Sequence, residues 1–261
     1  MNKELKILAE RICSSSSIVA FTGAGTSTES GISDYRSKGG LWMRHQPVTY
    51  QEFLADEQKR IEYWQGKMEL YQAFEYVHPN KAHLALAQLG SMGKLHSLIT
   101  QNIDGLHQMA GNTPEKVIEL HGNNRRTICL LCADLTSWEE TYKRLKSGEP
   151  TLRCRKCQGL LKPDTISFGQ RLDQNVLARA IQKVRECDLF MAIGSTLIVE
   201  PAASLPRLAK ELEIPLAIIN LSETPLDDLA DIHVVGSAGE VLSEVLQVVK
   251  QRNPQSRINV L

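Results

Sequence analysis

The chain of 261 residues carries 30 basic and 30 acidic side chains, so its formal net charge is zero. This balance creates no overall field that would attract nucleic acid or an anionic membrane, and it disfavours DNA binding as the main function. The length is enough for one large α/β domain, or a domain with a small companion, to bury a core without disulfides.

The sequence also indicates the compartment. No apolar run approaches the ~18 residues of a membrane span, and the first residues lack the uninterrupted apolar core of a secretory signal. Six cysteines are present, four of them in two close pairs, a pattern that does not suggest a disulfide framework. We therefore expect a soluble cytoplasmic protein with no membrane partner.

Short, mainly apolar segments recur along the chain. The first, residues 18–21, follows a helical pattern of Leu5, Leu8, Ala9 and Ile12. The later segments are residues 98–99, 117–118, 189–193, 216–221 and 232–235. Continuous rather than alternating apolarity is typical of parallel strands that are covered on both faces.

Helical patterns lie between these predicted strands. Leu177, Ile181 and Val184 share one helix face behind a capping residue, Asp173, and residues 241–249 form another such face. Strand and helix therefore alternate, which predicts an α/β fold with a Rossmann-like, doubly wound parallel sheet.

A glycine-rich loop, Gly23-Ala24-Gly25, follows the first predicted strand. Glycine lacks the Cβ that would keep a pyrophosphate away from backbone N–H groups at the start of a helix. However, Thr28 replaces the third glycine of the usual dinucleotide fingerprint, and no second strand supplies an acidic residue ~20 positions further on. A tight turn that serves only packing is therefore an open alternative.

The next segment, Asp34-Tyr35-Arg36, lies in a stretch rich in glycine and serine. Such a composition suits a mobile flap over a ligand. Arg36 could pair with phosphate and Tyr35 could cover a reactive sugar, although an arginine in a polar loop is more often merely solvated.

Polar residues also follow four later strands at the point where each ends. They are Gln101, Asn102 and Asp104, then His121, then Gly194, Ser195 and Thr196, and finally Asn220 and Ser222. Asn-x-Asp after a strand is by itself an ordinary turn or cap. Because the carboxyl ends of parallel strands meet at one edge, the shared placement predicts a crevice for a nucleotide. An imidazole in it is suited to accept a proton near neutral pH.

Two Cys-x-x-Cys pairs, Cys129/Cys132 and Cys154/Cys157, are separated by 21 residues. Four thiolates at this spacing suit one tetrahedral Zn²⁺. A closed set of four protein ligands leaves no position for a substrate, so the ion should stabilise rather than catalyse. A redox role is a poorer explanation, because both pairs would need a partner and the thioredoxin context is absent.

Residues 39–88 interrupt the alternation of strand and helix, because they show helical periodicity and no strand pattern. We interpret this region and the cysteine-rich region as insertions that together form a smaller domain. The predicted organisation is a Rossmann-like nucleotide-binding domain in three parts, residues 1–38, 95–122 and 165–250, a helical insertion at 39–94, a zinc ribbon at 123–164 and a C-terminal tail at 251–261.

Taken together, these motifs resemble the sirtuin family, in the family's order and over about residues 5–250. The matching segments are Gly-Ala-Gly-x-Ser-x-x-Ser-Gly-Ile-x-Asp-Tyr-Arg at 23–36, Gln-Asn-Ile-Asp at 101–104, His-Gly at 121–122, the two cysteine pairs, Phe168-Gly169, Gly-Ser-Thr at 194–196 and Asn220. The resemblance implies an NAD-dependent protein lysine deacylase. Such an enzyme transfers the acyl group of a modified lysine in a protein or peptide to ADP-ribose and releases nicotinamide.

The resemblance also implies roles for single residues. His121 would be the general base on the ribose hydroxyls, and Asn102 would orient the ribose and a water molecule. The cofactor contacts would come from Gly23, Ala24, Gly25, Thr28, Asp34, Tyr35, Arg36, Gln101, Asn102, Asp104, Gly194, Ser195, Thr196, Asn220 and Ser222. The four cysteines match the family's structural zinc site.

The chain departs from the family pattern at three places. The stretch from Asn220 to Thr224 differs from the common form, which leaves the exact adenosine contacts open. Ser33 replaces the usual proline before the Asp-Tyr-Arg segment, and Gln170 replaces a common glutamate near the peptide substrate. Members that favour negatively charged acyl groups carry a Tyr-x-x-Arg pair, whereas the stretch from Tyr63 to Lys67 contains none. We therefore expect a preference for apolar acyl groups, acetyl or longer.

Two other functions stay open at this level. A mono-ADP-ribosyltransferase or NAD hydrolase would use the same pocket and would also begin by expelling nicotinamide. A non-catalytic NAD sensor or zinc-ribbon interaction module is disfavoured, because a pure binder needs neither His121 nor Asn102.

Overall fold

The computed structural model describes residues 3–32, 47–74 and 76–252, apart from the side chains of residue 70 and residues 72–74. Ser33, Asp34, Tyr35 and Arg36, which the sequence places in a flap, lie outside the described residues.

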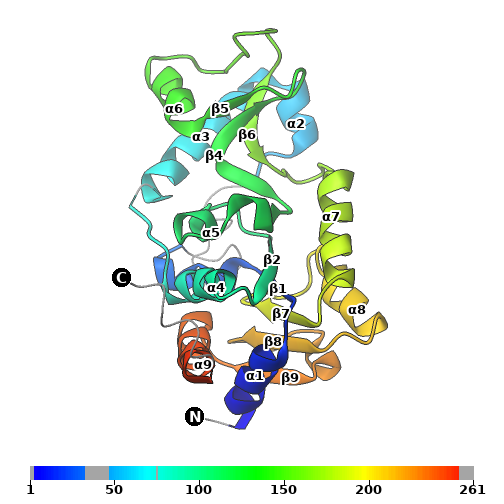
Figure 1. Cartoon of the computed structure of the whole chain (residues 1–261). Helices are drawn as coiled ribbons and strands as arrows, with labels where there is room; N and C mark the ends of the chain where they lie inside the picture. The colour runs from blue at the N-terminus through cyan, green and yellow to red at the C-terminus, as the bar shows by residue number, and fades with distance from the viewer. Residues whose placement is uncertain (1–2, 33–46, 75, 253–261) are drawn as a thin grey trace.

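A six-stranded parallel sheet forms the larger domain, in the lower part of Figure 1. Its strands are β1 (Ile18–Thr22), β2 (Leu95–Thr100), β3 (Val117–Glu119), β7 (Leu189–Ile193), β8 (Leu216–Asn220) and β9 (Ile232–Val235). They lie side by side in the order β3-β2-β1-β7-β8-β9. The prediction of a doubly wound parallel sheet is confirmed. The fifth strand ends at Asn220 rather than at Leu221, because Leu221 leaves the sheet and is exposed.

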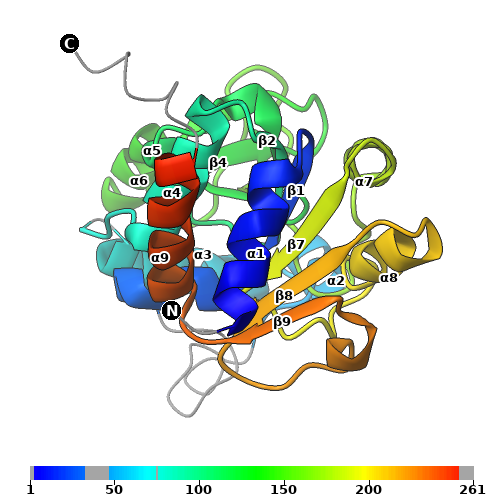
Figure 2. The same ribbon diagram turned by 60° about the horizontal axis from the view of Figure 1, so that its bottom comes forward.

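Helices cover both faces of this sheet, as Figure 2 shows. One face carries α1 (Lys3–Ser14), α4 (Lys81–Ser91) and α9 (Ala238–Arg252), and the other carries α7 (Gln174–Arg185) and α8 (Ser204–Glu211). Side chains of a strand point alternately to the two faces, so Ala20 packs in one core cluster and Phe21 in the other. This double burial explains why apolar residues predominate in the strands.

The predicted helix cap at Asp173 is confirmed. Its carboxylate accepts hydrogen bonds from the backbone N–H groups of Asn175 and Val176, at 2.7 and 3.3 Å. These are donors that the first turn of α7 leaves without a helical partner.

A second, smaller domain lies above the sheet in Figure 1. It contains an antiparallel sheet of β4 (Gly122–Cys129), β5 (Leu135–Ser137) and β6 (Leu161–Thr165), with α6 (Trp138–Lys146). The helices α2 (Tyr50–Ala55) and α3 (Glu57–Phe74) complete it. Trp64 of α3 stacks on Trp138 of α6 with 6.3 Å between the ring centroids, so the helical insertion and the cysteine-rich insertion share one core.

The helix α4 packs differently from α2 and α3. Ala82, Leu86 and Leu89 of α4 are buried in the same core cluster as α1 and α9, against the parallel sheet. Asn80 caps this helix by accepting hydrogen bonds from two backbone N–H groups of its first turn. We therefore propose that the helical insertion ends before Asn80 and that α4 belongs to the larger domain.

Candidate functional site

A cleft of about 1020 Å³ opens at the carboxyl edge of the parallel sheet, and residues of both domains line it. This volume lies at the upper end of the range for small-molecule sites, which leaves room for more than one ligand. The predicted residues that line the cleft are Gly23, Ala24, Gly25, Thr28, Gln101, Asn102, His121, Gly194, Ser195, Thr196, Asn220 and Ser222. The fold thus brings together residues that are far apart in the sequence.

The glycine-rich loop packs directly on the loop that follows β7. The N–H groups of Gly23 and Gly25 donate to the carbonyl oxygens of Ile193 and Gly194, at 3.1 and 2.8 Å. A Cβ at Gly23 would lie 2.8 Å from the Cβ of Ser195, and a Cβ at Gly25 would lie 2.9 Å from the oxygen of Gly194. Glycine is therefore required here for the contact between two loops, and this contact shapes the floor of the cleft.

Asn102 is held by two hydrogen bonds from its side-chain amide. Its Nδ2 group donates to the carbonyl oxygen of Gly23 and to Oγ of Ser27, both at 3.0 Å. Its backbone N–H donates to Oγ1 of Thr100 at 3.0 Å. Both amide hydrogens are thus used within the protein, and Oδ1 is the atom that a bound ligand or water can reach.

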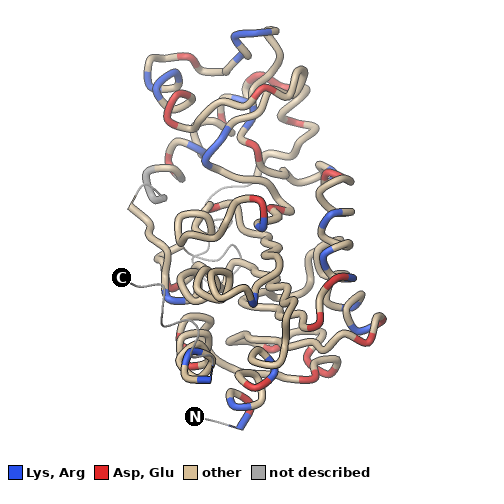
Figure 3. The backbone as a smooth tube through the Cα atoms, in the orientation of Figure 1, with Lys and Arg blue, Asp and Glu red and all other residues tan. Residues whose placement is uncertain are grey.

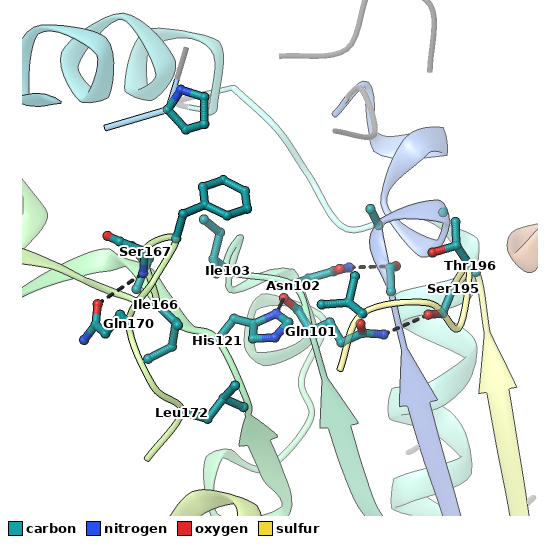
Figure 4. A pocket seen from close by; sticks show the side chains of 18 of the residues that line it. Gln101, Asn102, Ile103, His121, Ile166, Ser167, Gln170, Leu172, Ser195 and Thr196 are labelled. Atoms are coloured by element: carbon teal, nitrogen blue, oxygen red, sulfur yellow. Dashed lines mark hydrogen bonds between the residues drawn. The ribbon is translucent and has the colours of Figure 1, made fainter. Parts of the chain in front are cut away.

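His121 is oriented by the end of the neighbouring strand, as Figure 4 shows. Its Nδ1 lies 2.9 Å from the carbonyl oxygen of Gln101. A carbonyl oxygen only accepts, so Nδ1 carries the proton and the neutral ring keeps Nε2 as its proton acceptor. Burial lowers the pKa of His121 below its usual 6.5, although the bond to Gln101 acts in the opposite direction. The ring is therefore neutral at physiological pH and can act as a base.

Among the described residues that were predicted to contact the cofactor, Asp104 is the one that does not line the cleft. Its carboxylate is buried and accepts hydrogen bonds from Oγ of Ser27 at 2.8 Å and from the backbone N–H of Leu106 at 2.9 Å. Burial raises the pKa of this carboxyl, while these hydrogen bonds lower it in part. The structure places Asp104 behind Asn102, joined to it through Ser27.

Ser27 is a residue that the sequence reasoning missed. It bonds to both Asn102 and Asp104, and its Oγ also lies 3.4 Å from Nε2 of His83. Burial lowers the pKa of His83 to about 4, so this imidazole is neutral. The sequence signal was available, because Ser27 lies inside the motif at residues 23–36.

The carboxyl ends of β2 and β7 are tied together at the cleft. The Nε2 group of Gln101 donates to Oγ of Ser195 at 2.8 Å, which Figure 4 marks. Further along the edge, Nδ2 of Asn220 donates to the backbone oxygen of Ser222 at 2.8 Å. The first bond joins the ends of β2 and β7, and the second shapes the turn after β8, before any ligand binds.

The wall opposite the sheet edge consists of the segment that follows β6. The backbone N–H of Tyr50 donates to the carbonyl oxygen of Phe168 at 2.9 Å, and Nε2 of Gln51 donates to that of Gly169 at 3.1 Å. The lining residues of this wall are Thr165, Ile166, Ser167, Phe168, Gly169, Gln170 and Leu172. Sequence reasoning identified only Phe168, Gly169 and Gln170, because nothing in a short apolar-polar stretch indicates that it faces a cleft.

The four cysteines lie together at the far side of the small domain. Their sulfur atoms all lie within 4.8 Å of one another. Backbone N–H groups of Leu131 and Lys156 donate to the sulfurs of Cys129 and Cys154, each at 3.4 Å. Four thiolates at about this separation fit a tetrahedral zinc ion with Zn–S bonds of about 2.3 Å. The cluster is thus compatible with one structural zinc.

Comparison with known proteins agrees with this arrangement. The sequence profile of the Sir2 family matches residues 23–201. The chain is 50% identical over 241 residues to a protein of Thermodesulfovibrio yellowstonii named NAD-dependent protein deacetylase, covering 92% of this chain and 93% of that protein. It is 39% identical over 252 residues to NAD-dependent protein deacylase 2 of Archaeoglobus fulgidus, covering 96% and 98%.

A solved structure described as Sir2-p53 peptide-NAD+ superimposes with a TM-score of 0.84 at 34% identity, covering 95% of this chain and 98% of that one. Both the sequence and the fold are therefore shared from near one end of the chain to near the other, so the chain belongs to the Sir2 family, the sirtuins.

Proposed function

We propose that the chain is an NAD-dependent protein lysine deacylase that transfers an acyl group from lysine to ADP-ribose and releases nicotinamide. The observation that carries this function is the state of His121, a neutral imidazole that lines the cleft beside Asn102. The names of the relatives and the peptide and NAD+ in the similar structure support it.

The cleft fits an extended dinucleotide. It runs along the strand ends from the glycine-rich loop to Asn220 and Ser222, and small polar residues at each strand end line it beside apolar side chains. We assign the pyrophosphate to the loop from Gly23 to Thr28 and the adenosine end to Asn220 and Ser222. Bound NAD supplies an ADP-ribosyl group that accepts the acyl group once nicotinamide has left. Asp34, Tyr35 and Arg36 are assigned as further contacts on the family resemblance alone.

The residues of the cleft divide the chemistry between them. Nε2 of His121 takes the proton from the sugar hydroxyl that becomes the acyl acceptor. The imidazolium that forms keeps its Nδ1 hydrogen bond to the carbonyl oxygen of Gln101, which stabilises the new positive charge. Oδ1 of Asn102 orients a ribose hydroxyl or a water, and Ser27 and Asp104 hold Asn102 from behind.

Mass spectrometry of the products tests this function against its nearest alternative. Incubation with NAD and an acetyl-lysine peptide should give free lysine peptide, nicotinamide and O-acetyl-ADP-ribose. If ADP-ribosylated protein or free ADP-ribose formed instead, the chain would be a mono-ADP-ribosyltransferase or an NAD hydrolase.

The lowered pKa of His121 predicts the acid side of the pH profile. The base must be neutral, so kcat/KM should be constant above the pKa of His121 and fall as pH drops through it, with a midpoint below 6.5. A profile measured between pH 5 and 9 under saturating NAD checks this. A midpoint above 7 would contradict the assignment of a desolvated imidazole as the base.

The acyl preference can be tested on a panel of peptides. Without a Tyr-x-x-Arg pair, acetyl-lysine and longer apolar acyl-lysines should react at least tenfold faster than succinyl-lysine. Lys67 lines the cleft, but its Nζ bonds to Oδ1 of Asn124 at 3.3 Å and lies over the ring of Tyr63. In Lys67→Met the low succinyl rate should not change. A preference for succinyl-lysine that is lost in this variant would show that Lys67 recruits the anion.

We propose a cytoplasmic setting, because zinc-binding thiolates need a reducing compartment. No helix within the described ranges is long and apolar enough to cross a membrane. Lys and Arg alternate with Asp and Glu over both domains in Figure 3, which supports protein substrates rather than nucleic acid as partners.

A further inference from the structure

A buried lysine lies directly behind the wall of the cleft. Lys162 of β6 is only 1% exposed, although lysine is almost never fully buried without a charged partner. Its neighbour Asp164 forms an ion pair with Arg126 instead. Among the residues that the structure describes, no carboxylate forms an ion pair with Lys162.

Within the described residues, the ammonium group of Lys162 donates hydrogen bonds to the chain that follows it. Its Nζ donates to the carbonyl oxygen of Pro163 at 3.1 Å, to that of Thr165, and to Oγ of Ser167 at 3.2 Å. These three acceptors share one point charge, which therefore holds the segment from Pro163 to Ser167 at three places. Thr165 and Ser167 both line the cleft.

The same segment is tied to the catalytic histidine on its other side. The backbone N–H of Ile166 donates to the carbonyl oxygen of His121 at 2.9 Å. Ile166 and Ser167 lie in the cleft close to His121 in Figure 4. Lys162 therefore bonds to Thr165 and Ser167, and the backbone of His121 bonds to Ile166 between them. Together these bonds set the distance between this segment and the edge of the parallel sheet.

Tyr63 of α3 completes the cluster on the cleft side. Burial alone would raise the pKa of its phenol, but the charges of Lys67 and Lys162 and hydrogen bonds with Ser167 and Thr165 lower it. Burial also lowers the pKa of Lys162. The phenol, both acceptors and the ammonium thus form one connected polar group at the side of the cleft that faces the small domain.

An apolar side chain of similar length would avoid the cost of burying an ammonium without a counter-ion. Stability alone therefore gives little reason for a lysine here. What an apolar residue could not do is hold two carbonyl oxygens and a hydroxyl at one point, which determines the shape of the wall.

We propose that Lys162 is a positioning residue for the acyl-lysine substrate and acts through Thr165 and Ser167, which it holds in the wall of the cleft. This inference rests on the proposed deacylase function, because it assumes that the acyl-lysine passes along this wall. The sheet edge, where the dinucleotide is assigned, does not depend on Lys162.

The test uses the full chain and begins with the wild type. Deacetylation of an acetyl-lysine peptide by the wild type establishes the proposed function independently of Lys162. In Lys162→Met, the KM for the peptide should rise at least tenfold, while the dissociation constant of ADP-ribose stays within twofold. Lys143→Met, an exposed change in the same domain, serves as the matched control and should leave both constants unchanged.

The comparison between the change in peptide KM and the change in the dissociation constant of ADP-ribose decides the outcome. An unchanged peptide KM in Lys162→Met would overturn the proposal, and so would an equal loss of peptide and ADP-ribose affinity, since that would indicate general loosening of the fold. Ser167→Ala covers the case in which Lys162→Met does not fold, because it removes one acceptor and leaves the charge bonded to two carbonyls. It should raise the peptide KM by a smaller factor, and an unchanged KM there would equally overturn the proposal.

Where both variants fold, the double variant tests whether Lys162 acts through Ser167. The effect of Ser167→Ala should largely disappear in the Lys162→Met background, because the bond that it removes is already absent. Fully additive effects would show that the two residues act separately and would contradict a positioning role through Ser167.

Discussion

His121→Ala should lower kcat for deacylation by at least about a hundredfold, which is the lower range for loss of a general base. The variant removes Nε2, the only atom of the ring free to accept a proton once Nδ1 is bonded to Gln101. The dissociation constant of NAD should stay within about twofold, because the loop from Gly23 to Thr28 and the ends of β7 and β8 keep their positions. Steady-state kinetics and calorimetry measure the two quantities.

His96→Ala provides a matched control for this prediction. His96 lies near the amino end of β2, away from the cleft, where Nε2 is 3.1 Å from the carboxylate of Glu186. Its replacement should leave kcat unchanged. If His121→Ala retained wild-type turnover, the assignment of the base would be wrong, and the NAD-sensing alternative would regain support.

Loss of the zinc site should abolish turnover by unfolding the small domain. Cys129 is 1% exposed and shares the core of this domain with Trp64 and Trp138. Structural zinc binding contributes about 10 kcal/mol or more, which exceeds the total stability of many domains. Cys129→Ser should therefore disorder β4 and β6 and with them the wall at residues 165–170. Circular dichroism, zinc content and deacylation rate report the effect together.

Cys13→Ser is the control for this experiment, because Cys13 lies in α1 on the other side of the larger domain. It should keep its zinc and its activity. A Cys129→Ser protein that lost zinc but deacylated at the wild-type rate would show that the metal does not support the cleft.

Much of the fold was predictable from local patterns. Apolar segments predicted all six parallel strands, because strands covered on both faces bury most of their side chains whichever way they point. Asp173 predicted the start of α7, since a carboxylate there serves the N–H groups of the first turn. The paired cysteines predicted their own cluster, because thiolates at that spacing can reach one ion. Each of these signals depends on residues that are close in the sequence or on a fixed spacing between residues of one kind.

The signals failed where a residue's role depends on a distant contact. The sequence left two explanations for Gly23 and Gly25, and the structure shows that both glycines pack against the chain at Gly194 and Ser195, which lies about 170 positions further on. Asp104 follows Asn102 by two residues, but its side chain is buried behind the cleft rather than in it. Helical periodicity could not show that α4 packs against the parallel sheet rather than in the small domain.

The sequence by itself determined the order of the six parallel strands along the chain, the polar residues at the strand ends, the cysteine cluster and the resemblance to the sirtuins. Only the tertiary structure decided which ring nitrogen of His121 carries the proton and which residues support Asn102. It also showed that the buried Lys162 bonds to the segment that forms the cleft wall opposite the sheet edge. The physical reason is that periodicity and spacing act within a few residues, whereas a hydrogen bond across a cleft joins atoms that the chain brings together only after the two domains have packed.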